Sequence, residues 1–392
     1  MPTILHITTV ADSFVFMRGQ LGYMKAQGFD IIGVTSPGPR VEMVRKREGI
    51  EIYPVEMPRR ITPLEDLRAL WELVAVIQEI KPDIVHGHTP KGGLLAMIAA
   101  TIARVPHRVY HMRGLPMETA RGSKRALLAT TERISCGLAR EVITVGRTMR
   151  ETAIAEGLCP PEKIRYLGAG SSNGVDARER FNPERVGRGG RGEVRLRYGI
   201  PNDAVVLGFV GRLVVDKGIV EFLKAFEALE EQYPALHLLL LGPFEERDAL
   251  SSDVRARLEK HPRIHLPGFV EDTATYYSAM DLFCLPTHRE GFPNSPLEAA
   301  AMGLPVVVSD IGPCREVIVE GETGLLFPVG NAQRLKEVLE IYLKDEALRQ
   351  SHGEAGRARV LARFQPEQIW EGIAEVYAKL LTEVGSQRSE VG

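Results

Sequence analysis

The stretch from His288 to Pro305 carries the densest group of residues that could do chemistry. It follows the apolar run Leu282–Leu285, which predicts a buried strand, and Gly291 predicts a sharp turn into a helix with Pro296 in its first turn. The N–H groups at a helix start have no partner within the helix and favour a phosphate. We therefore expect Phe292–Leu297 to bind a phosphate group.

Two glutamates accompany this helix start. Glu290 lies on the loop before the helix, and Glu298 lies one turn inside it. Carboxylates accept hydrogen bonds from hydroxyl groups, so both side chains could bind the hydroxyls of a sugar. An acidic residue in a first helical turn usually only complements the helix dipole. The surrounding glycines and prolines favour a ligand-binding role here.

A second cluster runs from Gly211 to Gly218, directly after the apolar run Val205–Val210. Arg212 and Lys217 are expected to project from the carboxyl end of that strand, where two cations can neutralise a diphosphate without a metal ion. The alternative is a solvated loop with two ordinary surface charges. Together, the two clusters predict a site for a diphosphate that carries hydroxylated groups.

Elements of alternating type must position these clusters. Short apolar runs alternate with longer amphipathic segments, which is typical of βαβ units and a parallel sheet. The first half predicts a helix over Phe14–Gln27 and a helix that begins with a capping box at Thr62–Glu65. One face of the latter helix carries a regular set of apolar residues: Leu64, Leu67, Trp71, Val74 and Ile77. Strands are expected at Ile4–Thr9, Asp30–Thr35, Asp83–His86, Arg108–Met112 and Glu141–Val145.

The apolar pattern thins between about Asp176 and Pro201, where Arg185–Gly192 has the composition of a loop, and we place the domain boundary there. Its glycines formally match a dinucleotide-binding fingerprint, but no strand precedes them. The sequence thus predicts an α/β protein with two Rossmann-like, doubly wound parallel-sheet domains that face a cleft. The expected ranges are 1–178 for the first domain, 200–365 for the second, and 366–392 for a C-terminal helix and tail that could cross back to the first domain, with Gly385–Gly392 as a polar tail.

Composition excludes several classes of protein. The chain has 392 residues, enough for two domains, and its 49 basic and 51 acidic residues give a net charge of −2, so a nucleic-acid partner is not expected. The four cysteines are scattered, which excludes a disulfide scaffold and a zinc module. The start lacks the pattern of a secretion signal, and the longest uncharged stretch, Gly92–Ala103, is too short to span a bilayer. We expect a cytoplasmic protein.

The motifs carry a resemblance that covers most of residues 200–330. In order along the chain, they resemble retaining family-four glycosyltransferases of the GT-B fold. The motifs are Gly211-Arg212 with Lys217-Gly218, Leu239–Pro243, His265–Gly268, Asp281–Pro286, Glu290–Ala299 and Gly321–Leu325. Three upstream stretches resemble the branch that builds bacterial capsule, O-antigen or lipid-linked oligosaccharides: His86–Gly92, Tyr110–Pro116 and Ser171–Asp176.

The resemblance implies roles for these residues. Arg212 and Lys217 hold the donor diphosphate, Glu290 contacts the donor sugar, and Glu298 contacts the nucleotide ribose. The family needs no metal ion and no cofactor beyond the nucleotide-sugar substrate. The implied reaction moves a hexosyl or N-acetylhexosaminyl group, from UDP, to a surface glycan or a polyprenyl-diphosphate-linked acceptor. The implied donor-binding set is Gly211, Gly242, Gly291, Phe292, Pro293, Asn294, Ser295, Leu297 and Glu298.

The first half departs from the family in two places. The glycine pair after the first strand is replaced by Thr9–Phe16, and Arg113-Gly114 stands where many members have histidine-glycine. Lys91-Gly92-Gly93 could hold an acceptor phosphate or could be an ordinary helix start. The acceptor-side candidates are Asp12, His88, Lys91, His111 and Arg113.

Residues 101–150 hold ten basic and three acidic side chains. This stripe could hold the first domain against anionic lipid at the inner face of a membrane, or it could be a solvated helix face. Two other functions stay open: a nucleotide-sugar epimerase, and a nucleotide-sugar-binding protein without catalysis. Acceptor-dependent release of the nucleotide would distinguish a transferase from both.

Overall fold

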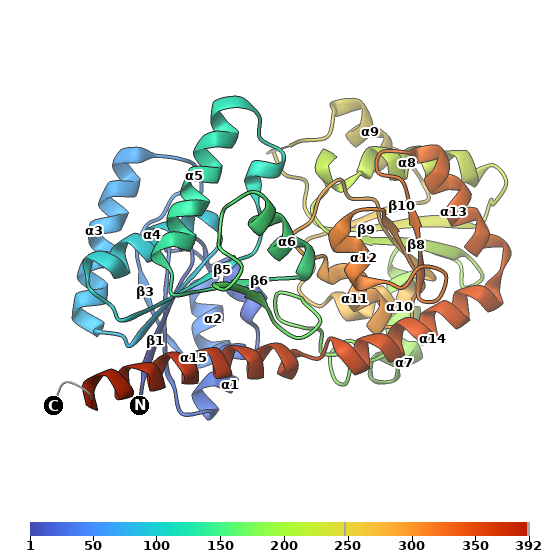
Figure 1. Ribbon diagram of the computed structural model, residues 1–392. Coiled ribbons are helices and arrows are strands. Elements are labelled where there is room, and N and C mark those ends of the chain that lie inside the picture. Colours follow the sequence, from blue (N-terminus) through green and yellow to red (C-terminus); the bar gives the residue numbers. More distant parts are fainter. Residues whose placement is uncertain (247, 390–392) are drawn as a thin grey trace. The chain divides into compact units, whose positions relative to one another are not determined.

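The structure is a computed structural model that describes residues 1–246 and 248–389. The chain forms two compact units (Figure 1). Unit 1 comprises Met1–Gly174 and the segment that begins at Pro366, and unit 2 comprises Val175–Gln365. Each unit contains one parallel sheet with helices packed on it, which confirms the predicted α/β class with two parallel-sheet domains.

The sheet of unit 1 has the strand order β3-β2-β1-β4-β5-β6-β7, and all its pairings are parallel. Its central strands are almost completely buried, because helices cover both faces of a parallel sheet. The strands are β1 (Thr3–Ile7), β2 (Asp30–Thr35), β3 (Glu51–Pro54), β4 (Ile84–His88), β5 (His107–Met112), β6 (Glu141–Thr144) and β7 (Ile164–Tyr166).

One predicted helix of unit 1 is two shorter helical segments in the structure. The predicted helix Phe14–Gln27 is split at Gly19, which has a left-handed φ of 78°. A Cβ there would lie 2.9 Å from the ring of Trp370, so only glycine fits. The helices of unit 1 are η1 (Ala11–Met17), α1 (Gln20–Ala26), α2 (Val41–Glu48), α3 (Pro63–Ile80), α4 (Pro90–Ile102), η2 (Pro116–Glu118), α5 (Gly122–Leu138), α6 (Arg147–Ala155) and α15 (Pro366–Ser389).

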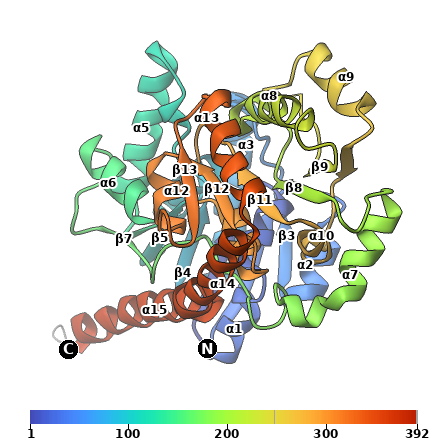
Figure 2. The ribbon, with the colours of Figure 1, turned by 90° about the vertical axis from the view of Figure 1, so that its right-hand side faces the viewer.

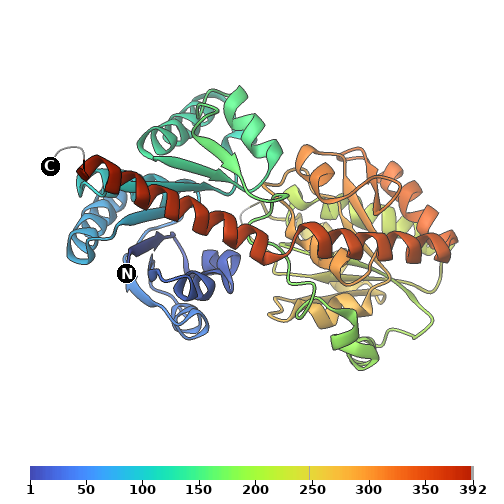
Figure 3. The same ribbon diagram turned by 60° about the horizontal axis from the view of Figure 1, so that its bottom comes forward.

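Helix α15 belongs to unit 1 and runs beside α1 (Figure 3). Its apolar side chains join one core with residues of β1, η1 and α1. The expected polar tail from Gly385 is helical as far as Ser389, and residues 390–392 lie outside the described part of the chain. The contribution of α15 to this core consists of Ile369, Ile373, Val376, Tyr377 and Leu380.

The predicted apolar face of α3 is only partly buried. Val74 and Ile77 lie in the core, whereas Leu64, Leu67 and Trp71 are 86%, 53% and 57% exposed. The helix buries Ala69 and Leu73 instead, so the buried stripe is rotated relative to the predicted one. The helix start also differs, because Asp66 rather than Glu65 bonds back to the backbone N–H of Thr62, at 3.2 Å.

The sheet of unit 2 has the order β10-β9-β8-β11-β12-β13, again with parallel pairings throughout. Helices α8 and α13 pack side by side (Figure 2). The strands are β8 (Val205–Val210), β9 (Leu236–Leu241), β10 (Ile264–Gly268), β11 (Leu282–Leu285), β12 (Val306–Ser309) and β13 (Gly324–Phe327). The helices are α7 (Pro183–Arg197), η3 (Val215–Lys217), α8 (Ile219–Glu230), α9 (Ser252–Lys260), α10 (Thr273–Ala279), α11 (Asn294–Ala301), α12 (Gly312–Val317), α13 (Ala332–Lys344) and α14 (Glu346–Arg363).

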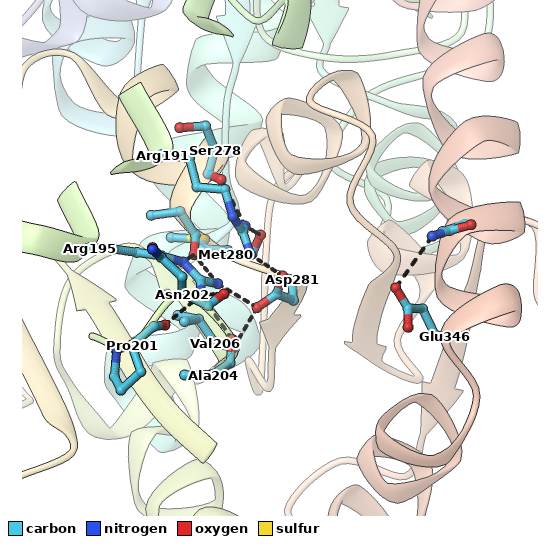
Figure 4. A network of polar contacts seen from close by, with 12 residues as sticks. Arg191, Arg195, Pro201, Asn202, Ala204, Val206, Ser278, Met280, Asp281 and Glu346 are labelled. Carbon is cyan, nitrogen blue, oxygen red and sulfur yellow. Dashed lines mark hydrogen bonds and ion pairs between the residues drawn. The ribbon is translucent and has the colours of Figure 1, made fainter. Parts of the chain in front are cut away.

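Helix α7 occupies the stretch that was expected to be a loop between the domains, so that expectation is wrong. The segment is helical on both sides of Gly187, which alone has a non-helical conformation, and it belongs to unit 2. Arg195 anchors it (Figure 4): its guanidinium is 1% exposed, bonds to the carboxylate of Asp281 at 2.7 Å, and donates to four carbonyl oxygens. Arg191 binds the other oxygen of Asp281, also at 2.7 Å.

Each sheet reverses its strand order once. In unit 1 the reversal lies between β1 and β4, and in unit 2 it lies between β8 and β11. Open parallel α/β sheets bind ligands beyond the carboxyl ends of the strands at such a point. The loops after these four strands are therefore the places to look for a site.

We expect Arg195→Ala to lower the free energy of unfolding by about 3 to 5 kcal/mol, because it removes one of the two arginine partners of Asp281 and the donor to four carbonyl oxygens. Urea unfolding measures the change. The matched control is Arg185→Ala, on the same helix, whose ion pair with Glu179 is exposed on both sides; it should change stability by less than about 0.5 kcal/mol. Equal effects of the two substitutions would contradict the anchoring role.

Candidate functional site

The reversal of strand order in unit 2 brings together two residues that are far apart in the sequence. Lys217 ends the short helix after β8, and Glu290 lies on the loop after β11; the Lys217 ammonium forms an ion pair with the Glu290 carboxylate. Both side chains are mostly buried. Gly218 makes this approach feasible, since it has a φ of 68° and a Cβ there would lie 1.9 Å from the carbonyl oxygen of Pro286.

Further contacts tie these two loops to each other. The backbone N–H of His288 donates to the carbonyl of Asp216 at 2.8 Å, and Arg289 binds the Asp216 carboxylate at 2.8 Å. These three residues lie within the predicted motifs, but no role was predicted for them. Their proximity follows from the neighbouring positions of β8 and β11 in the sheet. The loop that carries Lys217 and the loop that carries Glu290 therefore form one connected structure.

Arg212 lies at the same edge of unit 2 but pairs differently. Its guanidinium bonds to Glu245 at 2.9 Å, and both side chains are partly exposed. The supporting turn needs a glycine at position 242, where a Cβ would lie 1.8 Å from the carbonyl oxygen of Gly211. Glu245 was not among the predicted site residues. Its position shortly after β9, which neighbours β8, is the signal that could have revealed it.

Helix α11 starts as predicted, shortly after Gly291 and with Pro296 in its first turn. Its N-cap residue, Pro293, makes no side-chain hydrogen bond to the helix start. Phe292 and Leu297 are buried and fix the segment, while Asn294 and Ser295 are partly exposed. This arrangement suits an anion at the helix N-terminus.

Glu298 is held inside unit 2 by Tyr277. The tyrosine hydroxyl lies 3.0 Å from Oε2 of Glu298 and 3.2 Å from the carbonyl oxygen of Ser295. Burial raises the pKa of the Glu298 carboxyl group, against the opposing effects of Arg180 and of the Tyr277 hydrogen bond. A partly buried carboxylate of this kind gains from a hydroxyl donor supplied by a ligand.

Unit 1 gathers a cluster of histidines on one face of its sheet. His88 and His111, both predicted acceptor-side residues, are directly opposite each other on β4 and β5 and are buried. His6 and His86, which pair in register on β1 and β4, were not among the predicted site residues. The alternation of histidines at positions 86 and 88 was the available signal, because alternate residues of a strand share one face.

Arg113 follows β5 and adjoins this cluster. Its guanidinium donates to the carbonyl oxygen of Ser172 at 3.1 Å and lies 3.4 Å from Nδ1 of His88. Ring nitrogens of His6, His86 and His88 lie within 4.8 Å of one another, a spacing open to a metal ion. The positive charge of Arg113 beside His88 opposes a cation there.

The other two acceptor-side candidates are engaged elsewhere in unit 1. Lys91 forms an ion pair with Asp66 at 2.5 Å and donates to the carbonyl oxygens of Pro58 and Arg60. Asp12 is exposed and pairs with Arg40 at 2.7 Å. The ammonium of Lys91 thus holds the loop before α3.

Comparison with known proteins identifies the family. Residues 191–359 match the model described as glycosyl transferases group 1, and residues 15–170 match the glycosyl transferase 4-like domain. The chain is 33% identical to the capsular polysaccharide biosynthesis glycosyltransferase CapM of Staphylococcus aureus, over 97% of this chain and 98% of that protein. The chain belongs to the group 1 glycosyltransferases.

One further relative and one solved structure are informative for this glycosyltransferase. Over 64% of each chain it is 31% identical to the UDP-Gal:alpha-D-GlcNAc-diphosphoundecaprenol alpha-1,3-galactosyltransferase of Escherichia coli. Its fold is similar to that of Anabaena HepE, solved in complex with UDP and glucose, with a TM-score of 0.81, 20% identity and coverage of 97% of this chain and 100% of that one. The GT-B fold expected from the motifs is therefore confirmed.

No helix in the described part of the glycosyltransferase is both long and apolar enough to cross a bilayer.

We expect Glu298→Gln to be at least as stable as the parent protein at pH 7. Because burial raises the folded-state pKa of Glu298 above its unfolded value, the ionised carboxylate opposes folding at neutral pH, and this penalty disappears as the pH falls through the raised pKa. The advantage of the variant should therefore shrink from pH 7.5 towards about pH 4.5, near the ordinary carboxyl range.

Urea unfolding across this pH range measures the difference. The control is Glu337→Gln on α13, where hydrogen bonds from Gln333 and Arg334 lower the pKa of an exposed carboxyl, so any difference should have the opposite sign. A Glu298→Gln variant that is less stable than the parent by the same amount at every pH would contradict the burial argument.

Proposed function

We propose that this glycosyltransferase transfers a hexosyl or N-acetylhexosaminyl group from a UDP-sugar to a lipid-linked or surface-glycan acceptor, with retention of anomeric configuration and without a metal ion. The observation that carries this proposal is the contact of Lys217 with Glu290 at the reversal of strand order in unit 2. It joins a cation suited to a diphosphate and a carboxylate suited to a sugar hydroxyl.

The donor diphosphate would lie among Arg212, Lys217 and the N-terminus of α11. Arg212 is available for this because its ion pair with Glu245 is partly exposed, and such pairs are weak and readily exchanged. When the bond between the anomeric carbon and the diphosphate oxygen breaks, negative charge grows on the phosphate oxygens. Cations and backbone N–H groups that are already in position stabilise that charge.

The two glutamates would orient the rest of the donor. Glu298, held by Tyr277, would accept hydrogen bonds from the ribose, and Glu290 would accept one from the sugar. The acceptor hydroxyl would attack the anomeric carbon from the face that the diphosphate leaves. Its proton would pass to the departing diphosphate oxygen, so the step needs no further acid or base.

The relatives support the donor and acceptor classes. The Escherichia coli relative is named for a UDP-linked donor and a diphosphoundecaprenol-linked acceptor, the Staphylococcus aureus relative for capsular polysaccharide biosynthesis, and HepE was solved with UDP. These names favour a transferase that uses a UDP-sugar and a polyprenyl-diphosphate-linked glycan. An epimerase or a non-catalytic binder is less well supported, because neither needs an acceptor.

We expect Arg212→Ala and Glu290→Ala each to lower the rate of transfer by at least about a hundredfold while leaving the fold intact, because each removes a charge that acts on the donor. Acceptor-dependent release of UDP from a panel of UDP-sugars measures the rate, and circular dichroism checks the fold. EDTA should leave the parent rate unchanged.

The matched control is Arg334→Ala, which removes an exposed arginine of α13 that pairs with Glu337. It should retain full activity. Near-normal transfer by both Arg212→Ala and Glu290→Ala would refute the donor site, and UDP release that is independent of acceptor would favour the alternative functions.

We also propose that α5 holds unit 1 at the inner face of a membrane. The helix exposes Lys124 together with Leu127 and Ile134, and these two apolar residues, seven positions apart, share a face. Other arginines of the basic stripe are engaged: Arg125 pairs with Glu156, and Arg133 donates to the carbonyl of Gly157. The charge available to lipid is therefore smaller than the sequence count suggests.

We expect the parent protein to sediment with liposomes that contain anionic lipid, and to be released by salt. Leu127→Glu and Lys124→Glu should weaken this binding, because the first removes apolar area and both add negative charge. Leu196→Glu, at an exposed leucine of α7, serves as the control and should bind like the parent. Binding that is insensitive to anionic lipid and salt would contradict the proposal.

A further inference from the structure

Arg113 carries a partly buried positive charge that is paired with no carboxylate among the described residues of unit 1. Among the described residues, its partners are the carbonyl of Ser172, Nδ1 of His88 and the ring of Phe16, whose centre lies 5.9 Å from Cζ, and its buried Nε atom has no hydrogen-bond partner. Burial lowers its pKa to about 9, and the one group that acts in the opposite direction is Tyr377, not a carboxylate. The guanidinium is therefore still charged at pH 7, and a largely desolvated charge without a counter-ion is costly.

The histidines beside Arg113 cannot supply the missing negative charge. A guanidinium only donates, so Nδ1 of His88 accepts, and Nε2 of His88 then donates to Nδ1 of His6 at 2.9 Å. The chain continues from Nε2 of His6 to the hydroxyl of Tyr377 at 3.4 Å, and from that hydroxyl to Nδ1 of His86 at 2.5 Å. Each histidine in this chain is neutral and has one defined tautomer.

The pKa values agree with this reading of the chain. Burial, with a further contribution from Arg113, lowers the pKa of His6 to about 3 and holds those of His88 and His111 well below the ordinary range. The cluster ends in polar atoms without partners: Nε2 of His86 and both ring nitrogens of His111, on side chains that are at most 1% exposed. The cluster thus combines unused polar atoms with an excess of positive charge.

A second feature that favours an anion lies at the same place. His88 directly precedes Thr89, the N-cap residue of α4, a helix of 13 residues. Thr89 has a left-handed φ of 65° and offers the helix no side-chain cap. The positive end of α4 and the guanidinium of Arg113 therefore flank His88, beyond the reversal of strand order in unit 1.

We propose that Arg113 binds a phosphoryl group of a diphosphate-linked acceptor. This inference rests on the proposed transferase function and assigns the acceptor diphosphate to Arg113 rather than to Lys91, whose ammonium is committed to Asp66. A planar guanidinium can bind two phosphate oxygens through two parallel hydrogen bonds, whereas a lysine ammonium acts as a point charge. The ligand would supply the negative charge that unit 1 lacks.

The first test uses inorganic pyrophosphate as the probe and the full chain with a saturating concentration of UDP, so that the donor site is occupied. Calorimetry should show that the parent protein binds pyrophosphate under these conditions. Arg113→Gln should weaken this binding about tenfold or more and leave the affinity for UDP unchanged. Arg125→Gln, at a partly exposed ion-paired arginine of α5, is the control and should bind both ligands like the parent.

The second test distinguishes an acceptor diphosphate from free pyrophosphate. The acceptor sugar that supports transfer is presented on an alkyl diphosphate and, separately, as a neutral alkyl glycoside. Arg113→Gln should raise the KM for the diphosphate-linked acceptor about tenfold or more and that for the neutral glycoside less than about twofold. Arg113→Lys keeps the positive charge but loses the two parallel N–H donors, so its KM for the diphosphate-linked acceptor should lie between those of the parent and Arg113→Gln.

Several outcomes would overturn the proposal. These are the absence of pyrophosphate binding by the UDP-saturated parent, equal loss of UDP and pyrophosphate binding in Arg113→Gln, and equal effects on the two acceptors. Removal of a charge that has no counter-ion should leave the stability of the ligand-free protein unchanged or raise it. A melting temperature of ligand-free Arg113→Gln clearly below that of the parent would therefore indicate a structural role and contradict the proposal. Failure of the parent to bind UDP or to transfer to any acceptor would instead count against the proposed function.

Discussion

The functional geometry depends on one constraint, the single reversal of strand order in each parallel sheet. At that point the strand order runs in opposite directions on the two sides, and the loops that follow the two adjacent strands lie next to each other. In unit 2 this joins Lys217 to Glu290, although 73 residues separate them in the sequence. In unit 1 it places His6 and His86 side by side, with the start of α4 and Arg113 beyond them.

The sequence was most informative where local chemistry and topology agree. Buried parallel strands are continuous apolar runs, so β8 and β11 could be located, and glycines at positions such as 218 mark close approaches that no other residue allows. The order of motifs after these strands was enough to predict the GT-B fold and the turn into α11. These features depend on short segments, which a single sequence displays directly.

The remaining features depend on partners that are distant in the sequence. A glycine-rich stretch has low helix propensity, yet α7 forms because Arg195 binds Asp281 and several carbonyl groups of unit 2. The apolar residues of α3 show a helical period but not which side meets the sheet, so Trp71 is exposed. Glu245 and His6 become part of their sites only through strand neighbours that the sequence does not specify.

Unit 1 is built from two pieces of chain that lie on either side of unit 2 in the sequence. During synthesis, the core formed by β1, η1 and α1 therefore stays incomplete until α15 has left the ribosome and brought Ile373 and Tyr377 to it. Unit 2 is continuous in the sequence and has no such delay. A ribosome that stops before Pro366 would release a chain whose unit 1 has an open apolar face, so the core of the part translated first depends on a segment translated after all of unit 2.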